Sequence, residues 1–340
     1  MLFVYSIDAA FVQTDRSLLG AFSNVVPFLF RGSIDYPRLI VEIAKADLVY
    51  CWFALGFSAV ATTVARVMGR KSIVVAGGWD VTRAPEIGYG RLLYLRGRIG
   101  AAVALRQADR ILAFSDWSAA AIREVAPNGK ISRVYLGVDV EAFRPGLKED
   151  LVVCVSHVSR ENLRRKGLRT FIGAASEVPE ARFVLVGRAW DDSVDELRKM
   201  APDNVEISGW LQDDELRQLL ARAKVYVQVS YVEGFGLALA EAMAAGCVPV
   251  VTAAGAIPEV VGTTGIFVSY NDVPSLAAGV RQAIQSQGGI DARNRIIAGF
   301  RVDQRAEELR AVIGSLLGQS ITAFPNSPQR LDASQTEGGP

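Results

Sequence analysis

The chain has 340 residues, half of them hydrophobic, a formal net charge of +1 at pH 7 and a mean hydropathy of +0.23. This length allows two domains of ordinary size, each with its own core. The nearly neutral charge argues against nucleic acid as the main partner, and no apolar run reaches the ~18–20 residues that a membrane-spanning helix needs.

The amino terminus and the cysteines indicate the compartment. The first residues, MLFVYSIDAAFV, lack the basic segment of a signal peptide and predict a first strand. Three cysteines (Cys51, Cys154 and Cys247) lie in apolar segments, and an odd cysteine count with one histidine disfavours a disulfide framework or a zinc site. We therefore expect a cytoplasmic protein.

The first half of the chain alternates buried strands with helices, which predicts a parallel sheet covered on both faces. The expected strands are residues 2–7, 25–30, 47–54, 71–78 and 108–115. The expected helices are residues 35–46, 58–69 and 89–108. Residues 130–146 predict a closing strand and the exit from a first Rossmann-like domain, residues 1–146, with a linker over residues 146–150.

A second series of strands and helices follows and predicts a second Rossmann-like domain over residues 147–318. The expected strands are residues 151–159, 181–188, 205–210, 224–230, 248–253 and 265–270. The expected helices are residues 166–178, 195–201, 213–223, 257–262, 275–285 and 301–317. The polar tail, residues 319–340, is expected to be disordered.

The stretch YVEGFGLALAEAMAAG, residues 231–246, organises the second half. The apolar run 224–230 predicts a strand, Glu233 to Gly236 predict a glycine turn, and Leu237 begins a run of strong helix formers. A strand, a glycine turn and a helix start direct free backbone N–H groups at one point, which is suited to phosphate. Glu233 and Glu241 flank that point, and carboxylates accept hydrogen bonds from sugar hydroxyls. The arrangement therefore predicts a nucleotide-sugar site.

Glu233 and Glu241, seven residues apart in E-G-F-G-L-A-L-A-E-A-M-A-A-G, resemble the E-x7-E motif of the retaining glycosyltransferases of family four. That resemblance implies the GT-B fold, in which two Rossmann-like domains face one another across a cleft. It also implies that Glu233 contacts the donor sugar, that Glu241 contacts the ribose, and that the backbone of Phe235, Gly236 and Leu237 receives the diphosphate. The resemblance is strong over residues 125–317 and weak before them.

Basic residues after the strand 151–159 supply the charge that a departing diphosphate needs. Arg160 and Lys166 resemble the family's basic pair, with Arg164 and Arg165 as competitors for the role of Arg160. Because cations occupy this place and no D-x-D sequence is present, we expect no metal and no cofactor, with a nucleoside-diphosphate sugar as the donor substrate.

Two further segments resemble the family's nucleotide-contacting strand ends. The first is Gly187 and Arg188, and the second is Gly209, Trp210 and Leu211. The only histidine, His157, is a structural residue or lies on the donor side.

The first half departs from the family pattern at the reacting carbon. Where many members carry a histidine followed by an acidic residue, this chain has Gly77, and Asp80 keeps the acidic position. Asp80 either has a catalytic role, in which it orients the acceptor or supports the developing positive charge, or caps a turn. A glycine-rich turn after the first strand is also missing, which leaves Gln13, Thr14 and Asp15 as weak candidates for acceptor contact.

The resemblance implies a retaining, metal-independent transfer of sugar to a lipid, a glycan or a small molecule. The predicted helix 89–108 has four arginines among apolar residues, so it either packs with a solvated basic side or contacts the inner face of a membrane. Alternative functions are a non-catalytic donor-binding subunit of a glycosyltransferase complex, a GT-B nucleotide-sugar epimerase and a phosphorylase. The lone histidine disfavours the epimerase, and the lack of a pyridoxal-phosphate lysine context disfavours the phosphorylase.

Overall fold

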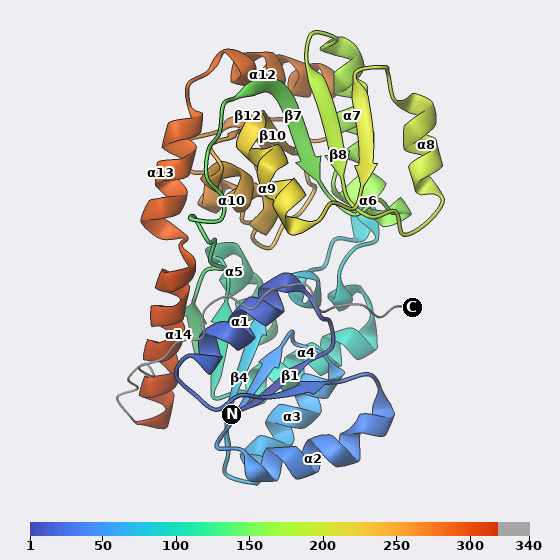
Figure 1. Cartoon of the computed structure of the whole chain (residues 1–340). Coiled ribbons are helices and arrows are strands. Elements are labelled where there is room, and N and C mark those ends of the chain that lie inside the picture. The colour runs from blue at the N-terminus through green and yellow to red at the C-terminus, as the bar shows by residue number, and fades with distance from the viewer. Residues whose placement is uncertain (319–340) are drawn as a thin grey trace.

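The computed structural model describes residues 1–318, and the expected disordered tail lies outside the described residues. Two lobes each contain a six-stranded parallel sheet with helices on both faces, as the alternating pattern predicts (Figure 1). Within residues 1–318 no helix is long and apolar enough to cross a membrane.

The sheet of the first lobe has the strand order β2-β1-β3-β4-β5-β6. Its strands are β1 (Leu2–Tyr5), β2 (Val26–Leu29), β3 (Leu48–Trp52), β4 (Lys71–Ala76), β5 (Arg110–Ala113) and β6 (Ile131–Arg133). Its helices are α1 (Ala10–Gly20), α2 (Tyr36–Lys45), α3 (Gly56–Val67), α4 (Leu95–Gln107) and α5 (Asp116–Val125). Short 3-10 turns are η1 (Ser33–Asp35), η2 (Trp79–Val81), η3 (Pro85–Ile87) and η4 (Arg91–Leu93).

The sheet of the second lobe has the order β12-β11-β10-β7-β8-β9. Its strands are β7 (Glu149–Val155), β8 (Arg182–Val186), β9 (Val205–Gly209), β10 (Ala223–Gln228), β11 (Val248–Thr252) and β12 (Ile266–Val268). The helices are α6 (Arg160–Arg165), α7 (Leu168–Glu177), α8 (Ser193–Met200), α9 (Asp213–Arg222), α10 (Leu237–Ala244), α11 (Ile257–Val261), α12 (Val273–Gln285), α13 (Gly289–Gly299) and α14 (Val302–Leu317).

Alternate residues of each strand enter different cores, because successive side chains point to opposite faces of a sheet. In the first lobe, Val4 packs with α2 to α5, whereas Phe3 packs with α1 and α14. In the second lobe, Val152 packs with α7, α8 and α12. The core that contains Phe3 continues into the second lobe, where Val153 and α10 belong to it. One apolar core therefore joins the two lobes.

The chain crosses between the lobes twice, and the two crossings lie side by side. The N–H of Val138 donates to the carbonyl of Phe300 at 2.8 Å, and the N–H of Val302 donates back to Val138 at 3.0 Å. The predicted linker, residues 146–150, already lies against the second lobe, where the N–H of Gly146 bonds the carbonyl of Ala221. The crossing therefore lies before the predicted linker, at Val138, where hydrogen bonds join it to the second crossing.

The last helix belongs in space to the first lobe. Figure 1 shows α13 alongside the second lobe and α14 continuing downward along the first. The predicted division at residues 146 and 147 placed this helix with the second domain. Its apolar residues Leu309 and Ile313 instead enter the core that contains α1. A hydrophobic period identifies a helix but does not say which sheet it covers.

Candidate active site

The predicted strand, turn and helix are present as β10, residues 233–236 and α10. Gly236 has a φ of +91° and precedes the first residue of α10, Leu237. This left-handed conformation favours glycine. Within residues 1–318, no protein acceptor receives the N–H groups of Phe235, Gly236 or Leu237. The side chain of Phe235 is buried in the core. The three N–H groups at this helix start are therefore available to a ligand rather than used by the protein.

Glu233 and Lys166 meet at this turn. The ammonium of Lys166 donates to the carboxylate of Glu233, and the two side chains are 17% and 14% exposed. Gln228, at the end of β10, donates to the same carboxylate oxygen at 3.0 Å. Burial lowers the pKa of Lys166. The pKa of Glu233 is also lowered, because the charges of Lys166 and Arg165 outweigh the effect of its burial. The pair therefore places one cation and one carboxylate beside the unused N–H groups.

Arg165, rather than Arg160, lies beside this pair. Its guanidinium donates to the side-chain oxygen of Asn162 at 2.8 and 3.1 Å and lies 4.7 Å from the ring centre of Tyr89. Arg160 begins α6 with a side chain that is 77% exposed and pairs with Asp192 at 3.0 Å. The expected basic pair, Arg160 with Lys166, is not brought together, because Arg160 pairs with Asp192 at the surface while Lys166 pairs with Glu233.

Tyr89 is a residue of this site that the sequence reasoning missed. It belongs to the first lobe, follows η3 and reaches the second lobe at Arg165. Burial raises its pKa to about 12. A second contact joins the lobes close by: the guanidinium of Arg164 donates to the backbone carbonyl of Glu86, three residues before Tyr89, at 3.3 Å. The segment was predicted as the start of a long helix, residues 89–108, whereas the α-helix begins only at Leu95. Gly88 and Gly90, both with positive φ, signal a turn there.

Glu241 lies on α10 and faces the start of α9. Burial raises its pKa to about 8, and the nearby charge of Asp213 adds to that increase. Its carboxyl group makes no hydrogen bond to another side chain or to the backbone within the described residues. A carboxyl group in this state is a free acceptor for hydroxyl groups.

The predicted nucleotide segments lie at the carboxyl ends of β8 and β9, next to His157. Gly187 bonds the carbonyl of Gly209 at 2.8 Å, and Arg188 lies 5.8 Å from the ring centre of Trp210. His157 lies 6.2 Å from Trp210 with nearly parallel rings, and its pKa is lowered by burial and by Arg188. The exposed ring of Trp190 lies 4.9 Å from His157. These rings form an aromatic face at the strand ends.

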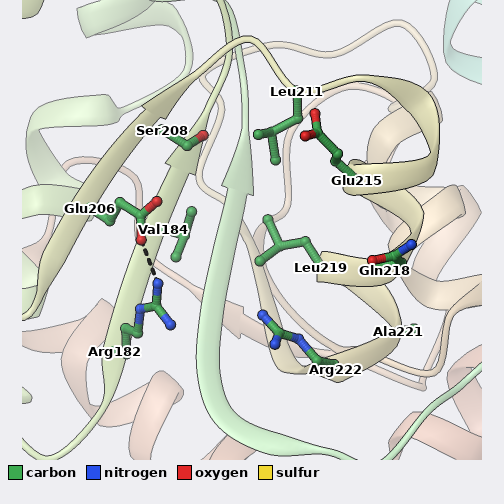
Figure 2. A pocket seen from close by; sticks show the side chains of 10 residues that line it. All are labelled: Arg182, Val184, Glu206, Ser208, Leu211, Glu215, Gln218, Leu219, Ala221 and Arg222. Atoms are coloured by element: carbon green, nitrogen blue, oxygen red, sulfur yellow. Dashed lines mark hydrogen bonds and ion pairs between the residues drawn. The ribbon is translucent and has the colours of Figure 1, made fainter.

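Leu211 points away from that face. Figure 2 shows its side chain in a cavity of about 490 Å³ between the sheet and α9. Neither Lys166 nor Glu233 lines this cavity, so it is separate from the turn described above. Leu211 can therefore contact a nucleotide through its backbone but not through its side chain.

Two of the first-lobe candidates, Asp80 and Asp15, have their carboxylates occupied by other protein groups. The carboxylate of Asp80 is buried and accepts the N–H groups of Ala54 at 2.8 Å and of Gly77 and Gly78 at 3.3 and 3.0 Å. This is the capping alternative for Asp80. The carboxylate of Asp15 is fully buried against Arg305, so the expected contact between Asp15 and an acceptor is wrong.

The two lobes touch at the candidate site. A Cβ added to Gly234 would lie 2.5 Å from the carbonyl oxygen of Gly77, so only glycine allows this approach. Ser115 donates to the carbonyl of Gly234 at 2.9 Å, and the N–H of Asp116 donates to the carboxylate of Glu259 at 2.7 and 2.9 Å. The structure therefore holds the lobes together across the glycine turn.

Comparison with known proteins supports this architecture. Residues 149–286 match the model of a family described as "Glycosyl transferases group 1". Over 93% of this chain and 100% of the other, the structure is similar to Anabaena HepE in complex with UDP and glucose, with a TM-score of 0.76 and 18% identity. The chain has the GT-B fold. In that fold, the turn 233–236 lies at the edge of the second lobe that meets the first.

Two curated relatives match parts of the chain. One is O-antigen chain mannosyltransferase B of Escherichia coli, which is 33% identical over 132 residues, or 36% of this chain and 34% of that protein. The other is an MMP alpha-(1->4)-mannosyltransferase of Mycolicibacterium hassiacum, which is 30% identical over 231 residues, or 61% of this chain and 54% of that protein. The chain thus spans about a third to a half of the length of these relatives.

Proposed function

We propose that the protein is a retaining glycosyltransferase that moves a sugar from a nucleoside-diphosphate sugar to an acceptor bound by the first lobe. The observation that carries this proposal is the turn between β10 and α10, where three N–H groups without a protein acceptor in the described residues lie beside the partly buried Lys166 and Glu233 at the contact between the lobes. The match to the glycosyl transferases group 1 model and the similarity to a structure that contains UDP support it.

Each group at the turn has a separate task. The N–H groups of Phe235, Gly236 and Leu237, with Lys166 and Arg165, bind the diphosphate and stabilise the charge that it gains as it leaves. These cations support a transfer that needs no metal. When the donor binds, the carboxylate of Glu233 exchanges its bond to Lys166 for bonds to sugar hydroxyls.

The reaction breaks the bond between the anomeric carbon and the β-phosphate oxygen, and a bond from the acceptor oxygen to that carbon forms on the same face. The acceptor proton passes to the departing phosphate oxygen, so no histidine base is required from the first lobe. This suits a chain that has Gly77 at the position of the family's histidine. Burial raises the pKa of Asp80, and its backbone contacts fix the turn 77–81 rather than the acceptor.

The nucleoside binds along the carboxyl-terminal edge of the second sheet, beside the turn 233–236. The free carboxyl group of Glu241 accepts the ribose hydroxyls, and the base lies near Gly187, Arg188 and the backbone of Gly209 to Leu211. The aromatic face of Trp210 and His157 offers a stacking surface beside them.

The test is the release of nucleoside diphosphate from a series of nucleotide-sugars, with and without candidate acceptors. Wild-type protein is expected to release it, with acceptor increasing the rate, in the presence of a metal chelator. Product analysis by NMR should show the same anomeric configuration as in the donor. Inversion of configuration would refute the retaining mechanism, and loss of activity in chelator would refute metal independence.

A non-catalytic donor-binding subunit is the second candidate, because the carboxylate of Asp80 is occupied by backbone N–H groups. Such a protein would gain thermal stability from a nucleoside diphosphate and yet release none from any nucleotide-sugar. A ligand at 100 times its dissociation constant raises stability by about 2.7 kcal/mol, so binding is measurable independently of turnover.

A further inference from the structure

The start of α4 and the residue before it present apolar side chains to solvent. Tyr94, Leu95 and Ile99 expose 59%, 69% and 56% of their surface. Leu95 and Ile99 are four residues apart in the helix and therefore lie on the same side of it. Large apolar side chains that gather on an exposed helix face mark a contact surface more often than isolated ones do. The proposed transfer reaction uses none of them.

The same face is cationic. Arg96 and Arg98 are exposed beside these residues, and we call the five residues from Tyr94 to Ile99, apart from Gly97, the α4 patch. No aspartate or glutamate occurs between residues 87 and 108. The acidic residue that follows this stretch, Asp109, is occupied by Ser72 and Lys71. Within residues 1–318, neither Arg96 nor Arg98 forms an ion pair with an acidic side chain, so both charges are open to an anionic partner.

A cavity adjoins the helix that carries the α4 patch. It has a volume of about 610 Å³ and lies at the carboxyl ends of β1 and β2, on the sheet edge that turns toward the second lobe. A Cβ added to Gly100 of α4 would lie 3.4 Å from the backbone nitrogen of Gly56, which lines the cavity. Its wall includes the rings of Phe30, Tyr36 and Phe57, together with Asp8 and Arg31. Polar and aromatic groups of this kind suit a sugar-bearing ligand.

We propose that the α4 patch docks the protein on an anionic lipid bilayer, so that the cavity receives the polar end of an acceptor held in that bilayer. The apolar side chains enter the boundary between headgroups and acyl chains, while Arg96 and Arg98 pair with lipid phosphates. The net charge of the whole chain is only +1, so this local charge provides the attraction. The acceptor role of the cavity rests on the proposed function, whereas docking on the bilayer does not.

The experiment is co-sedimentation of the full chain with vesicles of phosphatidylcholine, alone or mixed with phosphatidylglycerol. Wild type is expected to bind only the mixed vesicles and to lose binding as salt rises. The double variant Arg96→Gln/Arg98→Gln should bind about 30-fold more weakly, since each basic residue contributes about 1 kcal/mol at such a surface. Leu95→Ser/Ile99→Ser should abolish binding.

Matched controls remove the same side-chain types elsewhere. Val67→Ser replaces an exposed apolar residue at the end of α3, and Arg198→Gln replaces an exposed arginine of α8, and both should bind as wild type does. Equal binding to both kinds of vesicle, no binding at all, or undiminished binding by the α4 variants would overturn the proposal. So would light scattering that shows a wild-type dimer which the α4 variants separate.

Two measurements in the absence of vesicles distinguish this proposal from the proposed function. They are the thermal shift with a nucleoside diphosphate and its release from nucleotide-sugars. If both persist in a protein that ignores anionic vesicles, only the docking proposal fails. If both are absent while the vesicles bind, the transfer proposal fails and docking stands.

Discussion

Asp15 and Arg305 are 290 positions apart in the sequence and form a buried, doubly bonded ion pair. The guanidinium of Arg305 lies 2.6 and 2.8 Å from the two carboxylate oxygens of Asp15. Tyr50 donates to the same carboxylate at 2.8 Å, and Arg305 also donates to the carbonyls of Val134 and Tyr135. One residue of α14 thereby connects the first helix, the third strand and the end of the first sheet.

Removing one member of this pair should destabilise the protein strongly. Arg305→Met leaves the carboxylate of Asp15 buried without its cation, which is expected to cost about 3–5 kcal/mol. The double variant Asp15→Leu/Arg305→Met leaves no unpaired charge and should recover part of that loss. Urea unfolding followed by tryptophan fluorescence measures both. The result would contradict this account if the double variant lost as much stability as Asp15→Leu and Arg305→Met lose in sum.

Loss of Lys166 or Glu233 should reduce transfer strongly while the protein remains folded. Lys166→Ala removes the cation nearest the unused N–H groups, and a decrease in kcat of about 10²–10³-fold is expected for such a group. Glu233→Ala removes the carboxylate that would orient the sugar. Turnover is measured as release of nucleoside diphosphate, and circular dichroism checks the fold. Wild-type turnover in either variant would refute the site assignment.

Arg165 and Arg160 give a direct comparison of two arginines from one short helix. Arg165 lies beside Lys166, while Arg160 pairs with Asp192 at the surface. Arg165→Gln should therefore reduce kcat more than Arg160→Gln does. The comparison is made at saturating donor, with the thermal shift by nucleoside diphosphate recorded for both. A larger loss of kcat in Arg160→Gln would restore the basic pair that the sequence resemblance implies.

Nucleotide binding should strengthen as pH rises toward 8. The pKa of Glu241 is raised to about 8, so its carboxyl group is protonated at neutral pH in the unliganded protein. If ribose hydroxyls favour the carboxylate, binding releases a proton, and affinity increases up to about tenfold per pH unit below pH 8 and levels off above it. Calorimetry in buffers of different ionisation enthalpy counts that proton. Glu241→Gln should remove both the proton and the pH dependence.

The free protein should show the opposite trend in stability. Because the pKa of Glu241 is raised on folding, the folded state holds this proton more tightly than the unfolded state does. The contribution to stability is complete below the unfolded pKa of about 4.3 and is lost as pH rises toward 8. Urea midpoints of wild type and Glu241→Gln should therefore converge at low pH and differ most at high pH.

Gly234→Ala should separate the lobes without unfolding either. The added Cβ would meet the carbonyl of Gly77 at 2.5 Å, while the φ of Gly234 is not in the left-handed region. An increase in the radius of gyration by small-angle X-ray scattering, with unchanged circular dichroism, is expected. Gly236→Ala provides the contrast, since its φ of +91° strains the turn itself. An unchanged radius of gyration in Gly234→Ala would contradict this prediction.

The sequence predicts the sheets and the glycine turn because these depend on local order. The apolar run before Glu233, the glycines and the helix formers after them specify a strand, a turn and a helix wherever they fold. Lys166 and Glu233 follow neighbouring strands of one parallel sheet, β7 and β10, so their meeting is a consequence of strand order.

Contacts between the lobes were not predictable in the same way. Tyr89 lies in a segment with helical composition, and no residue near it in the sequence indicates a contact with Arg165 of the other lobe. The sequence suggests Asp15 as a contact for the acceptor, because a buried carboxylate is recognisable only once its cation is known. Arg160 was favoured over Arg165 on resemblance, and the phase of α6 decides which of the two faces Lys166.

The return of α14 to the first lobe has a consequence for how this chain is made. The ribosome synthesises β1 to β6 before it reaches Arg305. The carboxylate of Asp15 therefore has no cation partner in the first lobe until the second lobe has also been synthesised. A fragment that ends at residue 146 would never gain the ion pair between Asp15 and Arg305. The first lobe therefore acquires its final form last, although it is made first.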